Sequence, residues 1–420
     1  MKVLIAGFDL FGAVGGGQTY YQNTIRRNPS IEFHYFRFHE AKEQARPSNA
    51  RAIDYRDWHD GTHWEGRFDI QVPEWAFGIY LPAQNMARSV AGESFDIVEI
   101  PDYYQFGFFL RPALHYFDVN FGRIVLSMHG TISTSVLLNW WANGESIPWL
   151  QNLERMQYEA VDQRYFISEF YRDEWRSYSS QTSHYLDPLW FFDVPEPLSY
   201  RPQTTKPVLR FIGRVEKRKG PDLAVNLAWW LPRTAYDRLE LIGPECRNDR
   251  NESAAPILEE MIRARGIPAR LLPSQSQEEL ARGFADRSVT LVPSIYDSLN
   301  LVALESLFAG CPTVIGSGAG VCRYLRDRLP DVPFIRFDIE QFHTSTTKVE
   351  SLLNDYEKHR DALASALARI DVTPAGPTLA DIYRSPPSRD DAIAKVADRW
   401  HADLTRMLRD PAKPNVLVAA

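Results

Sequence analysis

The feature that most constrains the fold is a regular alternation of short apolar runs and helical segments in the second half of the chain. Each apolar run is rich in Val, Ile and Leu, and each helical segment repeats its apolar residues at helical spacing. The runs span residues 207–213, 239–243, 269–273, 289–294 and 312–317. Helices are predicted between them at 221–232, 255–266, 277–286 and 299–310, and Ser276 with Glu279 predicts a capping box at the start of the third. Strands that alternate with helices of about ten residues predict a parallel, doubly wound sheet.

The first half has the same rhythm in a less regular form. Strands are predicted at residues 2–8, 31–38, 95–100, 123–130 and 164–168, and helices near 18–28, 83–92 and 168–178. The polar stretch 41–69 is predicted to be a loop or an insertion. The chain is therefore predicted to be an α/β protein with two Rossmann-like, doubly wound domains.

A proline-rich segment separates the two halves. The sequence "DVPEPLSYRPQTTKP" at 193–207 is the best candidate for a linker. We expect an N-terminal domain at 1–197, a C-terminal domain at 198–387, and a helix and tail at 388–420. That last helix is expected to pack back on one of the halves, with the N-terminal domain as one candidate.

Composition excludes several classes of protein. The formal net charge is −7, so no overall basic field favours nucleic acid. The three cysteines have neither the spacing of a metal site nor the density of a disulfide scaffold. No apolar stretch approaches the ~20 residues of a spanning helix. We expect a cytoplasmic protein without a cofactor, for which peripheral contact with a membrane stays open.

Three consecutive glycines follow the first predicted strand. The stretch "GAVGGGQT" at 12–19 resembles a phosphate-binding loop, but Gln18 stands where such a loop has its lysine. Gly15, Gly16 and Gly17 still allow close approach of an anion to the backbone before a helix start. A simple turn between strand and helix is the alternative.

A cluster of basic residues follows the strand at 207–213. The loop "GRVEKRKG" contains Arg214, Lys217, Arg218 and Lys219. Such a loop is usually only a solvated surface. However, ligands of doubly wound folds bind beyond the carboxyl ends of the strands, where this loop lies. Two fixed cations there can hold a diphosphate.

Two carboxylates flank the start of the helix at 299–310. Asp297 lies in the loop before the helix, and Glu305 lies on the helix, eight positions later. The amides of Asn300, Leu301 and Val302 have no partner within the helix and can bind a phosphate. Carboxylates accept hydrogen bonds from polyol hydroxyls. An elongated ligand with sugars on either side of a diphosphate, a nucleotide sugar, fits this arrangement.

These motifs together resemble a known family. "GRVEKRKG" is similar to the pattern G-R-x-x-x-x-K-G, and Asp297 with Glu305 is similar to Glu-x7-Glu, in the retaining GT-B glycosyltransferases of family 4. The stretch "ALESLFAGCPTVIGSGAG" resembles the segment that follows in that family. The likeness is strong over about 205–325, and the glycine loop and His129 match in place. It implies a GT-B fold, with two domains facing a central cleft.

The resemblance also implies roles for individual residues. Glu305 would hold the ribose, Arg214 and Lys219 the diphosphate, and Asp297 and His129 the transferred sugar. Lys217 and Arg218, which lie between the two cations, are expected to be mostly solvated charges. The base would lie against the backbone of Leu272, Pro273 and Ser274. Asp297 is one methylene shorter than the family's more usual Glu, and Asn300 stands at a common glycine.

Weaker signals have ordinary interpretations. His59 and His63 are spaced like metal ligands, but Asp60-Gly61 lies between them, so a solvated loop is expected. The aromatic stretches at 102–117 and 139–150 can line an acceptor groove, although core packing is the better interpretation for most of them. The second stretch can also touch a lipid-linked acceptor.

The resemblance implies transfer of a hexose from a UDP- or GDP-linked donor to an unknown hydroxyl acceptor, with retention. No Asp-x-Asp motif suggests a metal-bound donor, so metal independence is expected. An inverting enzyme would need a base, for which Asp9 and Asp102 are the residues to check. Two alternatives remain: a nucleotide-sugar epimerase on the same fold, and a silent homologue that binds the donor only.

Overall fold

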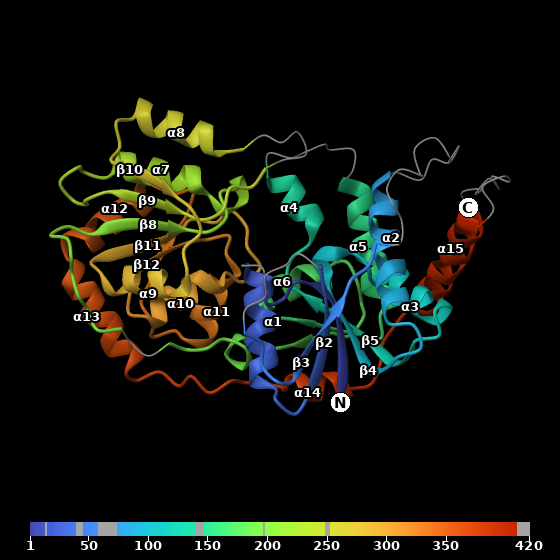
Figure 1. The fold of residues 1–420 in the computed structure, drawn as a ribbon. Helices are drawn as coiled ribbons and strands as arrows, with labels where there is room; N and C mark the ends of the chain where they lie inside the picture. Colours follow the sequence, from blue (N-terminus) through green and yellow to red (C-terminus); the bar gives the residue numbers. More distant parts are fainter. Residues whose placement is uncertain are drawn as a thin grey trace.

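The computed structural model describes residues 1–12, 15–38, 45–57, 74–139, 147–195, 198–247 and 253–409. Within these residues the chain forms two parallel sheets with helices on their faces, and the sheets lie side by side (Figure 1). This confirms the predicted α/β class with two Rossmann-like domains. His59 and His63 lie outside the described residues, as do residues 140–146 of the second aromatic stretch.

The sheet of the N-terminal domain has seven strands in the order β3-β2-β1-β4-β5-β6-β7. They are β1 (Lys2–Phe8), β2 (Glu32–Arg37), β3 (Ala50–Asp54), β4 (Ser94–Pro101), β5 (Asn120–Met128), β6 (Gln163–Phe166) and β7 (His184–Tyr185). All neighbouring pairs are parallel. The strand order reverses between β1 and β4, which is where doubly wound sheets bind ligands.

The sheet of the C-terminal domain has six strands in the order β10-β9-β8-β11-β12-β13. They are β8 (Val208–Ile212), β9 (Leu239–Ile242), β10 (Ala269–Leu272), β11 (Ser288–Val292), β12 (Thr313–Gly316) and β13 (Ile335–Phe337). Its reversal lies between β8 and β11. The basic loop follows β8, and Asp297 follows β11, so both predicted motifs lie at this switch point.

The helices of the N-terminal domain are α1 (Gly16–Arg27), α2 (Glu74–Ser89), α3 (Gly107–Tyr116), α4 (Ile132–Leu138), α5 (Ile147–Ala160) and α6 (Glu169–Arg176). Those of the C-terminal domain are α7 (Pro221–Trp230), α8 (Ala255–Ala264), α9 (Gln277–Ala285), α10 (Leu301–Phe308), α11 (Gly320–Arg328), α12 (Phe342–Asn354) and α13 (Tyr356–Leu367). The capping box predicted from Ser276 and Glu279 opens α9, which confirms that helix start.

Two predictions for the first half were wrong. The stretch 41–69 was expected to be a loop, but Ala50–Asp54 forms β3 and pairs with β2 in parallel. Ala50 is the one residue of this strand that is buried, because an edge strand has a single neighbour. The continuous apolar run that predicted the other strands is therefore missing here. The helix expected at 83–92 is α2, which begins at Glu74 and has Pro82 inside it.

For the aromatic stretch 102–117 core packing is confirmed, because Phe108, Phe109 and Leu110 are buried on α3.

The two domains share part of their hydrophobic core. One cluster of buried side chains continues from β1 and α1 of the N-terminal domain to α10 and α11 of the C-terminal domain. The segment after β7 joins them, where the Phe192 and Phe308 rings lie 5.6 Å apart between their centroids. Tyr324 donates a hydrogen bond of 3.0 Å to Asp187 across the same boundary. Burial of apolar surface therefore holds the domains together on this side.

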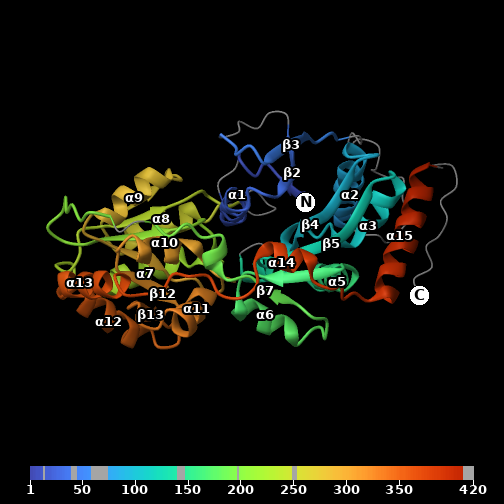
Figure 2. The same cartoon turned by 90° about the horizontal axis from the view of Figure 1, so that it is seen from below.

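The end of the chain returns to the N-terminal domain (Figure 2). The Tyr383 hydroxyl, on α14 (Leu379–Arg384), donates to the buried carboxylate of Glu99 on β4. Ser385 accepts a hydrogen bond of 2.6 Å from Gln163, and α15 (Asp391–Arg409) packs against α3 and α5. We therefore propose that the chain passes from the C-terminal domain back to the N-terminal domain before residue 379, rather than at residue 388. In the described chain no helix has the length and apolarity to cross a membrane.

Candidate active site

The glycine loop leads from β1 into α1. Gly16 is the first residue of α1, and a Cβ atom there would meet nothing within 4 Å. A Cβ atom on Gly17 would lie 2.6 Å from the Tyr103 hydroxyl, too close for any side chain. A Cβ atom on Gly15 would lie 2.6 Å from Oε1 of Gln18. Packing therefore explains Gly17, and of the three glycines it is Gly16 that keeps the open backbone that an anion needs.

His129 lies at the carboxyl end of β5, and its ring is packed among tyrosines. The ring centroids of Tyr20 and Tyr103 lie 4.6 and 5.7 Å from that of His129. Burial lowers the pKa of His129 to about 3, so the imidazole is neutral at physiological pH. Its Nε2 atom is buried and has no hydrogen-bond partner among the described residues. The ring can therefore form a hydrogen bond with a neutral ligand group such as a hydroxyl, but it does not provide a positive charge.

Asp102 holds the backbone of the loop that contains His129 and Gly130. Its two carboxylate oxygens each accept a 3.0 Å hydrogen bond, from the backbone N–H groups of His129 and Gly130. The Tyr171 hydroxyl donates to the same carboxylate at 3.0 Å. Burial raises the pKa of Asp102 to about 6, against the hydrogen bonds that lower it. Because Asp102 is fully buried and its oxygens are engaged, it does not offer an acceptor-side base.

Asp9 is the other carboxylate that an inverting mechanism would require us to check. Its Oδ1 atom accepts a 3.0 Å hydrogen bond from the backbone N–H of Phe38. The backbone of Asp9 has a φ of 48°, in the left-handed region. Asp9 therefore shapes the turn after β1 through its side chain.

The basic loop divides into exposed and buried cations. The Arg214 side chain is 50% exposed and lies 3.2 Å from Glu216 through Nη2 and Oε1. Lys217 pairs with Asp222 on α7. Arg218 was expected to be solvated like Lys217, and this was wrong. Its side chain is 9% exposed and its Nη2 atom lies 2.7 Å from Glu216.

Lys219 and Asp297 form a buried ion pair at the switch point. Nζ of Lys219 contacts Oδ2 of Asp297, and Nη1 of Arg218 lies 3.7 Å from Oδ1. Burial lowers the pKa of Lys219, although Asp297 opposes this shift. Burial alone would raise the pKa of Asp297, but Lys219 and Arg218 outweigh it and hold that pKa below its usual value. The carboxylate is thus charged and its oxygens face cations.

The start of α10 keeps backbone donors available. Asn300 has a φ of 76°, a conformation that favours glycine and that Asn tolerates best among other residues. Its Oδ1 atom caps the N–H of Ala303 at 3.2 Å, and its Nδ2 atom donates to Asp297 at 2.8 Å. Among the described residues, the N–H groups of Leu301 and Val302 have no acceptor in a loop or cap. These two amides can therefore bind an anion.

Glu305 lies one turn further along α10. The side chain is half-buried, and in the described part of the chain its carboxylate has neither a cation nor a hydrogen-bond donor. Burial raises the pKa of Glu305 to about 7. A carboxylate that is desolvated without compensation is costly, and such groups cluster at functional sites.

Leu272, Pro273 and Ser274 follow β10 at the edge of the sheet. The carbonyl of Leu272 accepts from the N–H of Gly243, and Pro273 and Ser274 are exposed. Among the described residues no hydrogen bond joins this segment to the basic loop or to α10. The structure thus brings together Lys219, Asp297 and Asn300, with His129 across the domain boundary, and leaves this segment separate.

The residues that form hydrogen bonds between the two domains were not predicted from the sequence. The Ser298 hydroxyl donates to the carbonyl of His129, and Tyr296 donates to Glu174 at 2.5 Å. Asn139 contacts both Glu216 and Arg218. No spacing in the sequence signals such contacts. Glu216 was visible inside the basic loop, where an acidic residue among four cations was the available clue.

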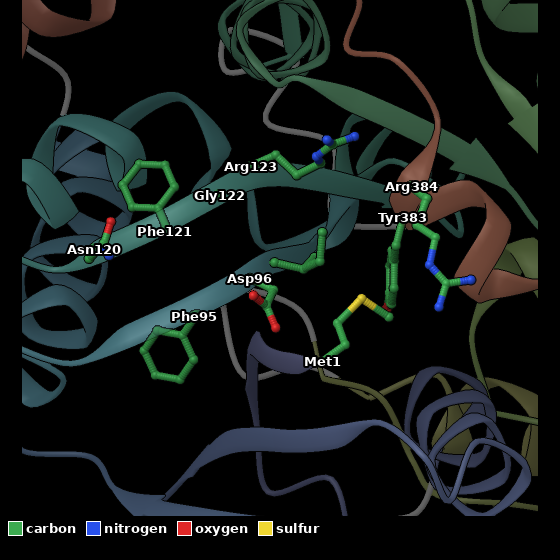
Figure 3. A pocket seen from close by; sticks show the side chains of 10 residues that line it. Met1, Phe95, Asp96, Asn120, Phe121, Gly122, Arg123, Tyr383 and Arg384 are labelled. Atoms are coloured by element: carbon green, nitrogen blue, oxygen red, sulfur yellow. The ribbon is translucent and has the colours of Figure 1, made fainter.

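A cavity of the N-terminal domain has none of the candidate site residues in its lining. It has a volume of about 630 Å³, and Met1, Phe95, Asp96, Phe121, Arg123 and Arg384 are among the side chains that line it (Figure 3). These residues lie near the amino ends of β1, β4 and β5, or on α14. His129 follows the carboxyl end of β5, so this cavity is at the opposite edge of the sheet from the candidate site.

Comparisons with solved structures support the fold. Sucrose-phosphate synthase from Thermosynechococcus elongatus aligns with a TM-score of 0.65 at 15% identity, over 96% of this chain and 99% of that one. The Anabaena protein HepE in complex with UDP-glucose aligns with a TM-score of 0.62 at 11% identity, over 96% and 99%. These likenesses confirm the GT-B architecture expected from the sequence.

Curated relatives match a shorter segment. D-inositol 3-phosphate glycosyltransferase from Mycobacteroides abscessus is 33% identical over 116 residues, which are 27% of this chain and 25% of that protein. The enzyme of the same name from Mycobacterium marinum is 28% identical over 174 residues, or 41% and 35%. The chain thus matches about a quarter to a third of the length of these relatives.

A family model covers the segment that contains the site. The model described as family 4 glycosyltransferase in conflict systems matches residues 166–378. The match includes the basic loop, the acidic pair and α10, and it extends over half of the chain. The chain therefore belongs to the family 4 glycosyltransferases of conflict systems.

Proposed function

We propose that this chain transfers a sugar from a nucleoside-diphosphate sugar to a hydroxyl group of an acceptor. The observation that carries the proposal is the arrangement at the switch point between β8 and β11. Two cations, Arg214 and Lys219, lie on one strand-end loop, and the half-buried, unpartnered Glu305 lies on the helix that follows the other strand. A ligand with a charged diphosphate next to a sugar with free hydroxyls can bind the two cations and Glu305 at the same time.

Each group has a proposed role in binding the donor. The amides of Leu301 and Val302, with Arg214 and Lys219, hold the diphosphate. Glu305 accepts hydrogen bonds from the two ribose hydroxyls, which gives its desolvated carboxylate partners. Leu272, Pro273 and Ser274 remain the proposed backbone surface for the base, as Gly15 and Gly16 remain a proposed surface for the anion or the transferred sugar.

The proposed reaction breaks the bond between the sugar C1 atom and the diphosphate oxygen. The acceptor oxygen forms the new bond to C1, and its proton passes to the departing diphosphate. Negative charge grows on the leaving group, where Arg214 and Lys219 stabilise it more strongly than in the bound donor. We propose retention at C1, because the oxygens of Asp102 are engaged and so the site offers no evident acceptor-side base.

The donor is proposed to be UDP-linked first and GDP-linked second. HepE, which shares the fold, was solved with UDP-glucose. Since Arg214 and Lys219 can neutralise the diphosphate, we also propose that transfer needs no metal. Groups of three potential metal-ligating side chains do not occur within the described residues.

The test is a thermal-shift screen with UDP, GDP, ADP and their glucose conjugates, followed by an assay of nucleoside diphosphate release with hydroxyl acceptors. Binding of a diphosphate to the folded state raises the melting temperature. We expect a shift that depends on the diphosphate, and release that depends on an acceptor and survives EDTA. An equal shift with uridine would contradict the proposed site, and loss of activity that manganese restores would contradict metal independence.

One observation favours a second candidate, a homologue that binds the donor without transfer. Asp297 pairs with Lys219, Arg218 and Asn300, so its charge offsets the cations that should attract a diphosphate. Such a protein would bind UDP-glucose and release no UDP with any acceptor. Release of free UDP or an epimerised donor without an acceptor would instead indicate an epimerase.

A further inference from the structure

Asn139 reaches from the N-terminal domain into the basic loop of the C-terminal domain. It follows α4 as the C-cap residue, and only 5% of its surface is exposed. Its Oδ1 atom accepts a 3.0 Å hydrogen bond from the backbone N–H of Arg218. Its Nδ2 atom lies 3.3 Å from Oε2 of Glu216 as a donor. One carboxamide thus uses both of its ends on residues 77 and 79 positions away in the sequence.

Glu216 links Asn139 to the cations of the basic loop. Its Oε1 atom accepts from Arg218 at 2.7 Å and lies 3.2 Å from Arg214, while Oε2 faces Asn139. The next residues, Lys217–Lys219, form a short 3-10 turn that ends with Lys219 against Asp297. The orientation of Glu216 and of the Arg218 amide therefore affects where Arg214 and Lys219 lie.

The other end of α4 is fixed within the N-terminal domain. Glu154 on α5 accepts a 2.8 Å hydrogen bond from the backbone N–H of Ser133 in the first turn of α4. Gln105 donates to the same carboxylate at 3.0 Å. With its start anchored in this way, α4 carries Asn139 as a fixed group, and the 216–218 segment can reach it only when the two domains are together.

We propose that Asn139 is a positioning residue, which sets the basic loop in its active geometry when the domains meet. Through it the N-terminal domain controls the diphosphate-binding cations of the C-terminal domain, so closure and stabilisation of the leaving group are coupled. This inference rests on the proposed function for its catalytic consequence. The hydrogen bonds of Asn139 to the basic loop do not depend on that function.

Hydrogen exchange tests the contact independently of any activity. In the wild type, Asn139 protects the Arg218 amide, and loss of that hydrogen bond should expose it. Asn139→Ala is expected to speed exchange at Arg218 by at least about tenfold, in the free protein and with UDP added. Unchanged exchange at Arg218 in a folded variant would overturn the inference even if the protein proves to be a glycosyltransferase.

Kinetics test the catalytic consequence. Asn139→Ala is expected to lower kcat for transfer about 10- to 100-fold, with the KM for the nucleotide sugar changed less than about threefold, because the cations act mainly in the transition state. Asn139→Asp should be at least as impaired, since it places a carboxylate opposite Glu216. Retention of wild-type kcat in Asn139→Ala would overturn the role. A wild type that neither binds UDP nor releases it contradicts the proposed function instead.

A double variant separates positioning from general packing. Asn139→Asp with Glu216→Gln exchanges the acid and the amide, so it keeps the total charge and both hydrogen bonds across the boundary. We expect it to recover kcat to within about fivefold of the wild type, whereas a structural role would leave it no better than either single variant. Arg323→Met is the matched control. It removes the ion pair with Asp173 across the same boundary, which involves no residue of the basic loop, and should leave kcat within about threefold.

Discussion

The carboxyl edges of the two sheets differ in the charge of the side chains that they present to a ligand. In the C-terminal domain the edge carries fixed charges: Arg214, Lys219 and Asp297 lie within one loop system, and Glu305 has a pKa of about 7. In the N-terminal domain the side chain at that edge without a hydrogen-bond partner, His129, is neutral. His129 has a pKa of about 3.

This difference assigns different parts of a ligand to the two domains. A charged ligand group gains most where preorganised opposite charges are already desolvated. A neutral polyol needs directional hydrogen bonds, which His129 Nε2 can make without a change in protonation. The comparison predicts that substitutions in the C-terminal domain act on the diphosphate and ribose, and those in the N-terminal domain act on the transferred sugar or acceptor.

The largest effect is expected from the cations. Arg214→Ala and Lys219→Ala should each lower kcat by at least ~100-fold, because each removes a preorganised group from the leaving group. Lys217→Ala is the matched control, since Lys217 pairs with Asp222, and it should change kcat less than about fivefold. Initial rates of nucleoside diphosphate release on variants with matched melting curves decide the outcome. If all three variants behave alike, the loop is only a basic surface.

The second effect concerns ribose. Glu305→Gln keeps the shape of the side chain and loses the charged acceptor, and a hydrogen bond to a charged group contributes roughly 1.5–3 kcal/mol. Affinity for UDP should therefore fall about 10- to 100-fold by calorimetry. The 2′,3′-dideoxy form of UDP is the control and should bind both proteins equally. If it discriminates between them as strongly as UDP does, Glu305 does not hold the ribose.

The pKa of Glu305 adds a dependence on pH. Its value of about 7 in the folded protein lies above that of an unfolded glutamate, so the folded state binds the proton more tightly. Stability contributed by the protonated form is therefore lost as pH rises from about 4.5 to about 7. Glu305→Gln should raise the melting temperature more at pH 8 than at pH 5. An equal gain at both pH values would contradict the raised pKa.

How far the sequence predicts the molecule also differs between the domains. In the C-terminal domain the alternation of strands and helices, the capping box at Ser276 and the switch-point motifs all follow from local patterns. In the N-terminal domain the edge strand Ala50–Asp54 and the helices with internal Pro82 and Pro112 do not, because tertiary packing overrides the local preference there.

The site shows the same limit. The types of residue at Lys219, Asp297 and Glu305 were visible as a motif, because they belong to one sheet edge and to neighbouring loops. Their electrostatic state was not visible. The burial of Arg218 and the neutrality of His129 depend on residues from elsewhere in the chain, and the Asn139 contact spans 79 positions. Sequence patterns locate chemistry at strand ends, but desolvation is a property of the whole fold.

A fourth prediction examines the neutral side chain of His129. His129→Phe retains an aromatic ring among the tyrosines and removes the free Nε2 atom, so one neutral hydrogen bond is lost. Since such a bond contributes about 0.5–1.5 kcal/mol, kcat/KM for transfer should fall about 3- to 10-fold. Affinity for UDP, measured by calorimetry, should not change. If UDP affinity falls as much as transfer, His129 belongs with the diphosphate site and the contrast between the two edges fails.

The smallest effect is expected at Asn300, where the backbone rather than the charge is tested. A φ of 76° favours glycine, and a residue with a Cβ atom but no local hydrogen bond costs about 1–2 kcal/mol in this region. Asn300→Gly and Asn300→Ala lose the same contacts with Asp297 and Ala303. The free energy of unfolding of the glycine variant should therefore exceed that of the alanine variant by about 1–2 kcal/mol, measured from urea midpoints at equal slopes. Transfer rates of the two variants should agree with each other, because the charged edge of Lys219 and Asp297 is the same in both. A rate that follows stability instead would mean that the conformation at the mouth of α10, and not the ion pair beside it, sets the donor site.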